Sequence, residues 1–179
     1  MNETIRTLKN RCSAKKYLSR QVDDKLLDAI LEAGLYAPSG MNNQKVVAVA
    51  VRDQVTRDQL SKLNAQVMGA ENDPFYGAPC VIVVLSDPER MTWVEDGSLV
   101  MGNLMNAATS LGLGNCWIHR AKEVFDTPEG KALLKKWGLP ETYRGVGNCI
   151  LGYADGEPVR KPRADGRIVK IDQKLYYKF

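Results

Sequence analysis

The spacing of apolar and polar residues predicts helices that alternate with short strands. Leu26 to Leu35 form an apolar stripe at helical spacing, with Asp23 or Asp24 as the helix cap and an end before Pro38. Residues 80–85 form an uninterrupted, β-branched apolar run, which is typical of a strand that is covered on both faces. Further helices are expected at 2–10, 56–68, 96–110 and 127–137, and further strands at 46–51, 115–119 and 146–151. These elements predict an α+β fold with helices on both faces of a short sheet.

The helix expected at 96–110 has almost no charge after its first residue, Asp96. Small side chains recur along it at Gly102, Ala107 and Ser110. Small residues allow a second backbone to approach closely, so we expect this helix to lie in the core and also at an interface between subunits.

Composition sets limits on the class of protein. The chain has 179 residues, 44% of them hydrophobic, and a formal net charge of +4, which predicts one domain over 1–179 with a real core. Lys and Arg are spread along the chain and no nucleic-acid-binding motif appears. No signal peptide opens the chain and no apolar stretch approaches the ~20 residues of a membrane span. We therefore expect a cytoplasmic protein with anionic small-molecule ligands and neither nucleic acid nor membrane as a partner.

Cysteine and histidine usage argues against a metal site. Cys12, Cys80, Cys116 and Cys149 form no Cys-x-x-Cys pair, and the last three lie in apolar runs, as buried thiols do in a reducing compartment. His119 is the single histidine, so a histidine-rich metal centre is impossible. The side chains supply little chemistry of their own, which points to an organic cofactor.

The strongest sign of a ligand is the alternation of polar side chains at Arg11, Ser13 and Lys15. In an extended segment these three would project to one side, where two cations and a hydroxyl suit a phosphate. A loop at 37–44, rich in small residues and side-chain amides, follows some twenty residues later. Each motif alone is more often a solvated basic face or a simple turn. Together, with a helix between them, they predict a cofactor site with one part for a phosphate and one for the polar edge of a ring.

Six segments, in the same order along the chain, resemble the FMN-dependent nitroreductase family, a group of small homodimeric flavoenzymes. They are Arg-Cys-Ser-Ala-Lys at 11–15, Ala-Pro-Ser-Gly-Met-Asn-Asn-Gln at 37–44, Gly-Ala-Pro at 77–79, Leu-Gly-Leu-Gly-Asn-Cys-Trp-Ile at 111–118, Ile-Leu-Gly-Tyr at 150–153 and Lys-Pro-Arg at 161–163. The resemblance covers nearly the whole chain. It implies a mostly antiparallel central sheet and an intertwined dimer in which the C-terminal tail, 168–179, adds to the partner's sheet.

The resemblance also implies roles for individual residues. The FMN phosphate, with parts of the ribityl chain and the pyrimidine ring, would be held by Arg11, Ser13, Lys15 and Arg163, with Lys161 in support and Cys12 contributing its backbone. Pro38, Ser39, Gly40 and Asn42 would reach the flavin from the other subunit. Asn64 would touch the pyrimidine edge, and Ile118 and His119, continuing to Arg120, would place backbone groups near the reactive N5 atom. The absence of a Gly-x-Gly-x-x-Gly element favours FMN over FAD.

Three departures from the family pattern stand out. Lys45 replaces a frequent proline, and Gly40 replaces a serine and so removes a hydroxyl. His119 and Arg120 replace small residues after Trp-Ile. His119 is therefore either a strand-end residue turned to solvent or a lining residue that meets an anionic substrate or a phosphate.

The implied activity is an NAD(P)H-dependent FMN oxidoreductase. NADH or NADPH would deliver a hydride to flavin N5 and leave, and an acceptor such as a nitroaromatic, a quinone or a flavin would then take the electrons in a ping-pong sequence. No side chain would act as acid or base, and Lys15 would stabilise negative charge on the reduced ring. The alternatives are a flavin-binding protein without turnover, as a store or sensor, and a specialised member of the fold such as a flavin-destroying enzyme, a dehalogenase or an enone reductase. Residues 69–77 leave little room for an elaborate lid.

Overall fold

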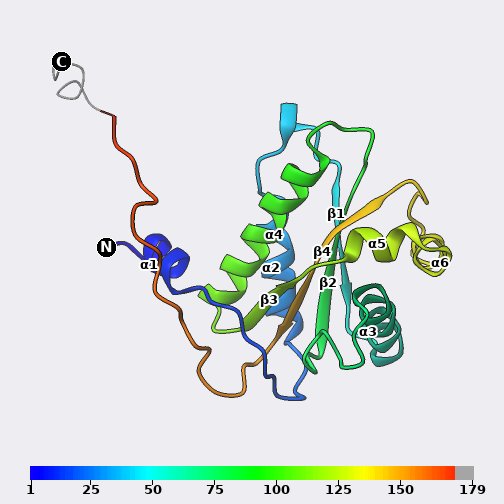
Figure 1. Cartoon of the computed structure of the whole chain (residues 1–179), viewed down its shortest axis with the longest axis horizontal. Helices are drawn as coiled ribbons and strands as arrows, with labels where there is room; N and C mark the ends of the chain where they lie inside the picture. Colours follow the sequence, from blue (N-terminus) through cyan, green and yellow to red (C-terminus); the bar gives the residue numbers. More distant parts are fainter. Residues whose placement is uncertain (172–179) are drawn as a thin grey trace.

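A computed structural model describes residues 1–171, and in this part of the chain the strands form one antiparallel sheet (Figure 1). The strands are β1 (Val46–Val51), β2 (Cys80–Ser86), β3 (Gly114–Ile118) and β4 (Arg144–Gly152), in the order β1-β2-β4-β3. In this register Ile82 of β2 lies between Ala50 of β1 and Cys149 of β4. The antiparallel sheet confirms the predicted α+β fold.

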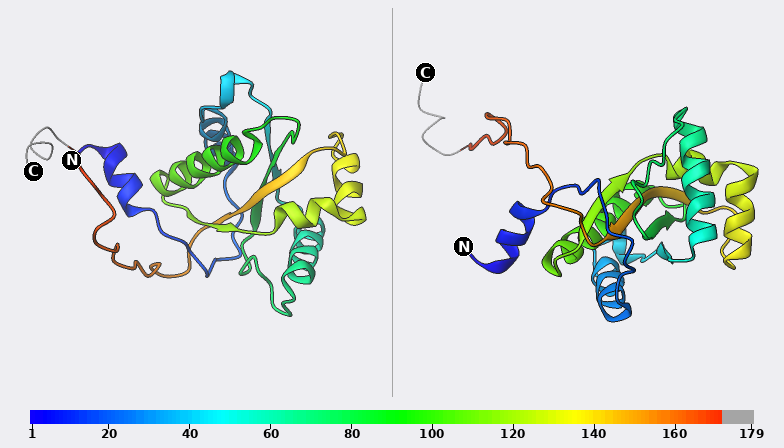
Figure 2. Two further views of the ribbon diagram at one scale, coloured as in Figure 1. Left: turned by 45° about the horizontal axis from the view of Figure 1, so that its top comes forward. Right: turned by 90° about the horizontal axis from the view of Figure 1, so that it is seen from below.

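Helices lie on both faces of the sheet. They are α1 (Glu3–Asn10), α2 (Asp24–Leu35), α3 (Gln54–Met68), α4 (Trp93–Ser110), α5 (Ala121–Asp126) and α6 (Pro128–Lys136), with a short 3-10 turn, η1, at Gly40–Asn42. Helices α2 and α4 pack on one face, and α3, α5 and α6 on the other (Figures 1 and 2). No helix among residues 1–171 is long and apolar enough to cross a membrane.

Strand β2 separates two hydrophobic cores. Its residues alternate between them, with Val81 and Val83 facing α3 and α5, and Ile82 and Val84 facing α2 and α4. Every residue of β2 is buried. This confirms the interpretation of the apolar run as a strand covered on both faces, and it explains why the run lacks the polar alternation of a half-exposed strand.

The element boundaries differ from the predicted ones in instructive places. Helix α4 begins at Trp93, before the expected first residue Asp96, so Asp96 lies inside the helix. Its carboxylate turns inward and accepts hydrogen bonds from the Gly40 N–H at 2.8 Å and the Thr92 hydroxyl at 3.1 Å. Strand β3 ends at Ile118, so His119 lies just beyond it. Helix α5 was not predicted, because six residues are too short to show a helical period.

Both ends of the described chain project from the body (Figures 1 and 2). Helix α1 buries none of its residues, although the side chain of Asn2 caps it through the Ile5 N–H at 3.0 Å. Residues 155–171, here called the arm, run along the body and then away from it, and every residue of 160–171 is exposed. The tail predicted to join a partner's sheet falls largely at 172–179, which lie outside the described residues.

Candidate functional site

The polar segment 11–15 lies along the outer edge of β3. The Ala14 N–H donates to the Asn115 carbonyl at 3.0 Å, and Ser13 forms a parallel bridge with Asn115. Ala14 is buried while Ser13 and Lys15 on either side are exposed. The extended, alternating conformation inferred from the sequence is therefore present at this position, and β3 enforces it.

Tyr17 anchors the end of this segment. Its hydroxyl donates to the Ala14 carbonyl at 2.8 Å, and burial raises the pKa of that hydroxyl, so it remains a neutral donor. Tyr17 also pairs with Ala154, where the chain leaves β4 and approaches the arm. A side chain at Gly114 would come within 2.9 Å of the Ala14 Cβ, so glycine allows this close packing.

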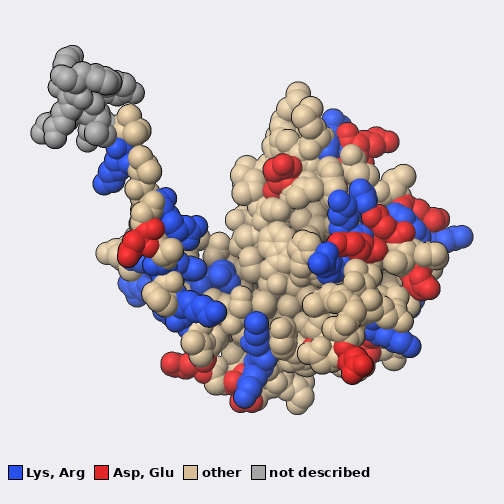
Figure 3. Space-filling model, viewed as in Figure 1, with Lys and Arg blue, Asp and Glu red and all other residues tan. Residues whose placement is uncertain are grey.

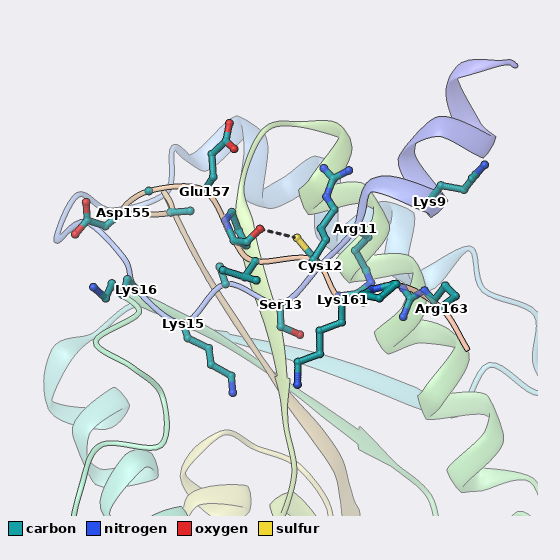
Figure 4. A pocket seen from close by; sticks show the side chains of 17 residues that line it. Lys9, Arg11, Cys12, Ser13, Lys15, Lys16, Asp155, Glu157, Lys161 and Arg163 are labelled. Atoms are coloured by element: carbon teal, nitrogen blue, oxygen red, sulfur yellow. Dashed lines mark hydrogen bonds between the residues drawn. The ribbon is translucent and has the colours of Figure 1, made fainter. Parts of the chain in front are cut away.

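A cavity of about 970 Å³, here called the basic cavity, lies between the N-terminal segment and the arm (Figure 4). Its cationic lining residues are Lys9, Arg11, Lys15, Lys16, Arg160, Lys161 and Arg163, against two acids, Asp155 and Glu157. Cys12 lines it as well, with its thiol 3.8 Å from the Pro158 carbonyl. In Figure 4 the side chains of Lys15 and Lys161 extend in the same direction on either side of Ser13. The structure thus brings the predicted phosphate residues of the N-terminal segment and of the arm into one cavity.

The cations of the basic cavity can bind a ligand because they are not paired with acidic side chains of the described chain. Within residues 1–171, none of its cations forms an ion pair. Arg160 makes a neutral contact instead, donating to the Asn10 amide oxygen at 3.0 Å. Blue side chains accordingly gather along the arm and the neighbouring part of the body in Figure 3. Unpaired guanidinium and ammonium groups around one space suit a phosphate.

A second cavity, of about 590 Å³, adjoins the first, and Ser13 and Lys15 line both. Its remaining lining residues are Met68, Asn72, Pro74, Tyr76, Cys116, Trp117, Ile118, His119 and Arg120. The Lys15 ammonium lies 5.5 Å from the centre of the Tyr76 ring, within the range of a cation–π contact. The two cavities are therefore neighbours, with Ser13 and Lys15 in the lining of each.

The loop at 72–77 forms one wall of the second cavity, and Asp73 holds that loop in place. The Asp73 carboxylate accepts hydrogen bonds from Arg57 and Ser61 of α3, both at 2.5 Å, and from the backbone N–H groups of Phe75 at 2.9 Å and Gly77 at 2.7 Å. Partial burial acts to raise the pKa of Asp73, but these hydrogen bonds outweigh it and lower the pKa. The loop is thus anchored to the body by a charged, half-buried network.

Unusual backbone angles occur in two places within residues 1–171, the lining of the second cavity and the loop at 37–44. Tyr76 and Arg120 have positive φ angles of 52° and 81°, which are uncommon for residues other than glycine, and both line the second cavity. The other three such residues, Met41, Asn42 and Gln44, lie in the predicted ring-binding loop. A conformation of this kind costs roughly 1–3 kcal/mol and persists where the surrounding structure requires it.

The predicted loop 38–42 does not reach either cavity in this chain. It lies at the start of α4, where Gly40 contacts Asp96 and the Ser39 hydroxyl accepts from the Gln44 N–H at 3.1 Å. A Cβ on Gly40 would fall 2.4 Å from the Thr92 hydroxyl oxygen, so the glycine that departs from the family pattern fits a tight position.

Asn64 and His119, both predicted to lie near the flavin ring, have different surroundings. Asn64 is fully buried one helical turn before Met68: its amide oxygen accepts from Asn148 at 3.1 Å and its amide nitrogen lies 3.2 Å from the Met68 sulfur. Its polar atoms are engaged within the protein, and Met68 occupies the cavity lining instead. His119 is exposed and also lines the second cavity, and its contact with an anion stays a prediction.

Several lining residues had no role in the sequence analysis. They are Lys9, Lys16, Met68, Asn72, Pro74, Tyr76 and Arg160. No sequence pattern marks Tyr76: it stands directly before Gly77, and the left-handed angles of both residues appear only in the folded turn that leads into β2.

Comparison with known proteins places the chain in a family. A sequence profile of the Nitroreductase family matches residues 8–74 and 67–153. An Archaeoglobus fulgidus protein, provisionally named an NADH dehydrogenase/NAD(P)H nitroreductase, is 32% identical over 163 residues, which cover 88% of each chain. The chain belongs to the nitroreductase family.

Two solved structures share the fold over almost the whole chain. A Bacteroides fragilis nitroreductase with bound FMN is 30% identical with a TM-score of 0.89, and the match covers 96% of this chain and all of that one. A Desulfitobacterium hafniense nitroreductase with bound FMN is 28% identical with a TM-score of 0.87 and the same coverage. The described sheet and its helices are thus the nitroreductase fold.

Proposed function

We propose that this chain is an NAD(P)H-dependent oxidoreductase whose residues 1–179 form one FMN-binding domain. Family membership and the FMN held by the two solved relatives support the cofactor. The residues of this chain fit it independently. The basic cavity has the size of a cofactor site, and its unpaired cations match a phosphate dianion. The single observation that carries the proposal is the pair of joined cavities, one strongly cationic and one walled by rings and backbone.

Each predicted residue then has a task. Arg11, Ser13, Lys161 and Arg163 would hold the phosphate, and Cys12 would contribute its backbone. Lys15 lies where the two cavities meet, so its ammonium would stabilise negative charge on the polar edge of the ring. Ile118 and His119 would present backbone groups to the ring from the end of β3.

FMN, when bound, would supply the redox chemistry, which is acceptance of a hydride at N5 from NADH or NADPH and, in a ping-pong sequence, reduction of a nitroaromatic, a quinone or a flavin. The residues of the two cavities would bind and orient the cofactor. The half-buried network around Asp73 would keep the wall of the second cavity in place while donor and acceptor exchange.

A homodimer would complete the site. Pro38, Ser39, Gly40 and Asn42 lie away from the cavities of their own chain, which supports a role in the partner's site. Apolar side chains on the outer face of α4 remain partly exposed, with Val94 at 44% and Leu99 at 46%, and subunit contact would cover them.

Absorbance measured under nitrogen tests this function. We expect the purified protein to be yellow and to lose its ~450 nm absorbance when NADH or NADPH is added, because the donor must reach the flavin. Heat-released cofactor should run as FMN on chromatography. An FAD peak would contradict the cofactor assignment, and a protein that stays yellow with both donors would instead be a flavin-binding store or sensor.

A further inference from the structure

The charged side chains that line the second cavity have one sign. Lys15, His119 and Arg120 are the basic residues that line it, and no Asp or Glu is among the described residues that do so. These three residues come from different elements: the N-terminal segment, the end of β3 and the start of α5. A cleft with one sign of charge concentrates ligands of the opposite sign.

The guanidinium of Arg120 is held in place but has most of its donors free. Its Nη1 donates to the Glu123 carboxylate at 2.8 Å, and its side chain is 48% exposed. A guanidinium has five N–H donors in a rigid fork, and this ion pair uses one of them. The left-handed backbone at Arg120 is a second constraint on its direction. Arg120 can therefore accept an anion while Glu123 orients it.

The rest of the cavity offers flat, apolar surface. Pro74 is buried and Tyr76 lies over Lys15, with Met68 beside them in the lining. Asp73 fixes the loop that carries Pro74 and the aromatic ring of Tyr76. A flat aromatic ring in a fixed loop favours a planar ligand.

We propose that the second cavity selects planar electron acceptors that carry an anionic group, such as a carboxylate or sulfonate on an aromatic ring, and that Arg120 and His119 are the residues that determine this specificity. The inference rests on the proposed function, because the bound cofactor engages Lys15 and leaves Arg120 and His119 for the acceptor. Their side chains take no part in the electron transfer itself, and His119 would meet the cofactor through its backbone alone. They raise the affinity for one class of acceptor over its neutral analogue.

The test compares two acceptors of the same shape, 4-nitrobenzoate and the neutral 4-nitrobenzamide. Equilibrium dialysis against the oxidised holoenzyme gives the dissociation constant of each, and steady-state kinetics gives kcat/KM. We expect 4-nitrobenzoate to bind roughly five- to twentyfold more tightly, the range for a charge-assisted contact at a half-exposed site. The preference should shrink in high salt.

Three variants assign the preference to residues. Arg120→Asn removes the charge and keeps a residue type that tolerates the left-handed backbone, so the fold is retained. We expect it to remove most of the preference for 4-nitrobenzoate, and His119→Gln to reduce it. Lys122→Asn is the matched control, because Lys122 is an exposed cation two positions away that lines neither cavity. It should leave the preference unchanged.

The outcomes separate this inference from the function on which it rests. Equal dissociation constants for the two acceptors, or a preference that survives in Arg120→Asn, would overturn the inference while turnover stands. A change confined to the KM for NADPH would overturn it as well, since Arg120 would then serve the donor. A flavin that is not bleached by either donor would refute the proposed function, whatever the dialysis shows.

Discussion

The two walls of the site are built in opposite ways. The loop at 72–77 is tied to α3 by the Asp73 network and buries Pro74 and Phe75. The arm at 155–171 is mostly exposed and touches the body through few hydrogen bonds, such as that from the Asp155 N–H to the Lys16 carbonyl at 3.0 Å. Yet the arm supplies three of the cations of the basic cavity.

The two walls should therefore differ in how much they become ordered when a ligand binds. A wall held by buried hydrogen bonds has its shape before any ligand arrives, so little ordering is needed on binding. A wall of exposed cations has few packing contacts, and local opening of such a segment requires little free energy. We therefore expect the ring side of the site to be rigid and the phosphate side to become ordered with its ligand.

The largest expected effect is a loss of stability when the hydrogen bonds that hold the loop at 72–77 are weakened. Asp73→Asn should lower the free energy of unfolding by about 2–3 kcal/mol, because it weakens four hydrogen bonds and leaves the buried Arg57 guanidinium with a poorer partner. Denaturant titration measures this loss. The control is Asp58→Asn, which changes an exposed partner of the same arginine and should cost less than ~1 kcal/mol. Equal losses in the two variants would show that the loop is not held by Asp73.

Arginine-to-alanine variants compare the two sides of the basic cavity, the N-terminal segment and the arm. Arg11→Ala and Arg163→Ala should each weaken FMN binding roughly ten- to a hundredfold, because each removes a charge-assisted contact. Fluorescence titration of the apoprotein with FMN gives the dissociation constants. Arg167→Ala is the matched control on the arm, since Arg167 is an exposed arginine outside the cavity lining. A variant that keeps full flavin occupancy after dialysis would show that its residue has been misassigned.

Proteolysis tests whether the arm becomes ordered with the ligand. Trypsin should cleave the apoprotein first within the arm, after Arg163 or Arg167, and FMN at ten times its dissociation constant should slow this cleavage about tenfold. Mass spectrometry of the fragments identifies the sites. Cleavage at the same rate with and without FMN would mean that the arm does not close on the ligand.

The smallest expected effect is a pH dependence of the rigid wall. The folded pKa of Asp73 is below its usual 3.8, so its stabilisation is fully present above pH 3.8 and is lost as the pH falls through the folded pKa. The stability difference between the protein and Asp73→Asn should be constant near neutral pH and should shrink in acid. The other carboxyl groups with a lowered pKa, Asp53, Glu123 and Asp126, are common to both proteins and cancel in the difference. A difference that stays constant down to pH 2 would contradict this assignment.

Most of the fold could be predicted from local sequence patterns. The strand at 46–51 and the alternation at 11–15 were predicted because backbone conformation and side-chain direction follow from neighbouring residues. The burial of β2 on both faces was predicted from its uninterrupted apolar run, because a strand with one exposed face would alternate apolar and polar residues. Three of the cysteines are buried, as the apolar runs around them indicated.

Contacts between distant residues escaped the sequence analysis. The pairing of Asp73 with Arg57 joins positions 16 apart, and no period or motif marks it. The left-handed angles of Tyr76 and Arg120 are set by the loops around them, because neither residue type favours that region. Asp96 was expected to begin a helix, and only the folded chain brings Gly40 to its carboxylate.

The bridge between Ser13 and Asn115 has a further consequence, for solubility. The outer edge of β3 would otherwise present free N–H and C=O groups, and such edges recruit strands from other molecules and start aggregates. Segment 11–15 covers part of this edge and adds Arg11 and Lys15, charges of the kind that discourage edge-to-edge association. Its register is doubly constrained, because a one-residue slip would bury the charges and expose Ala14. One short stretch of chain thus protects the sheet from other copies while it offers its alternate side chains to an anion.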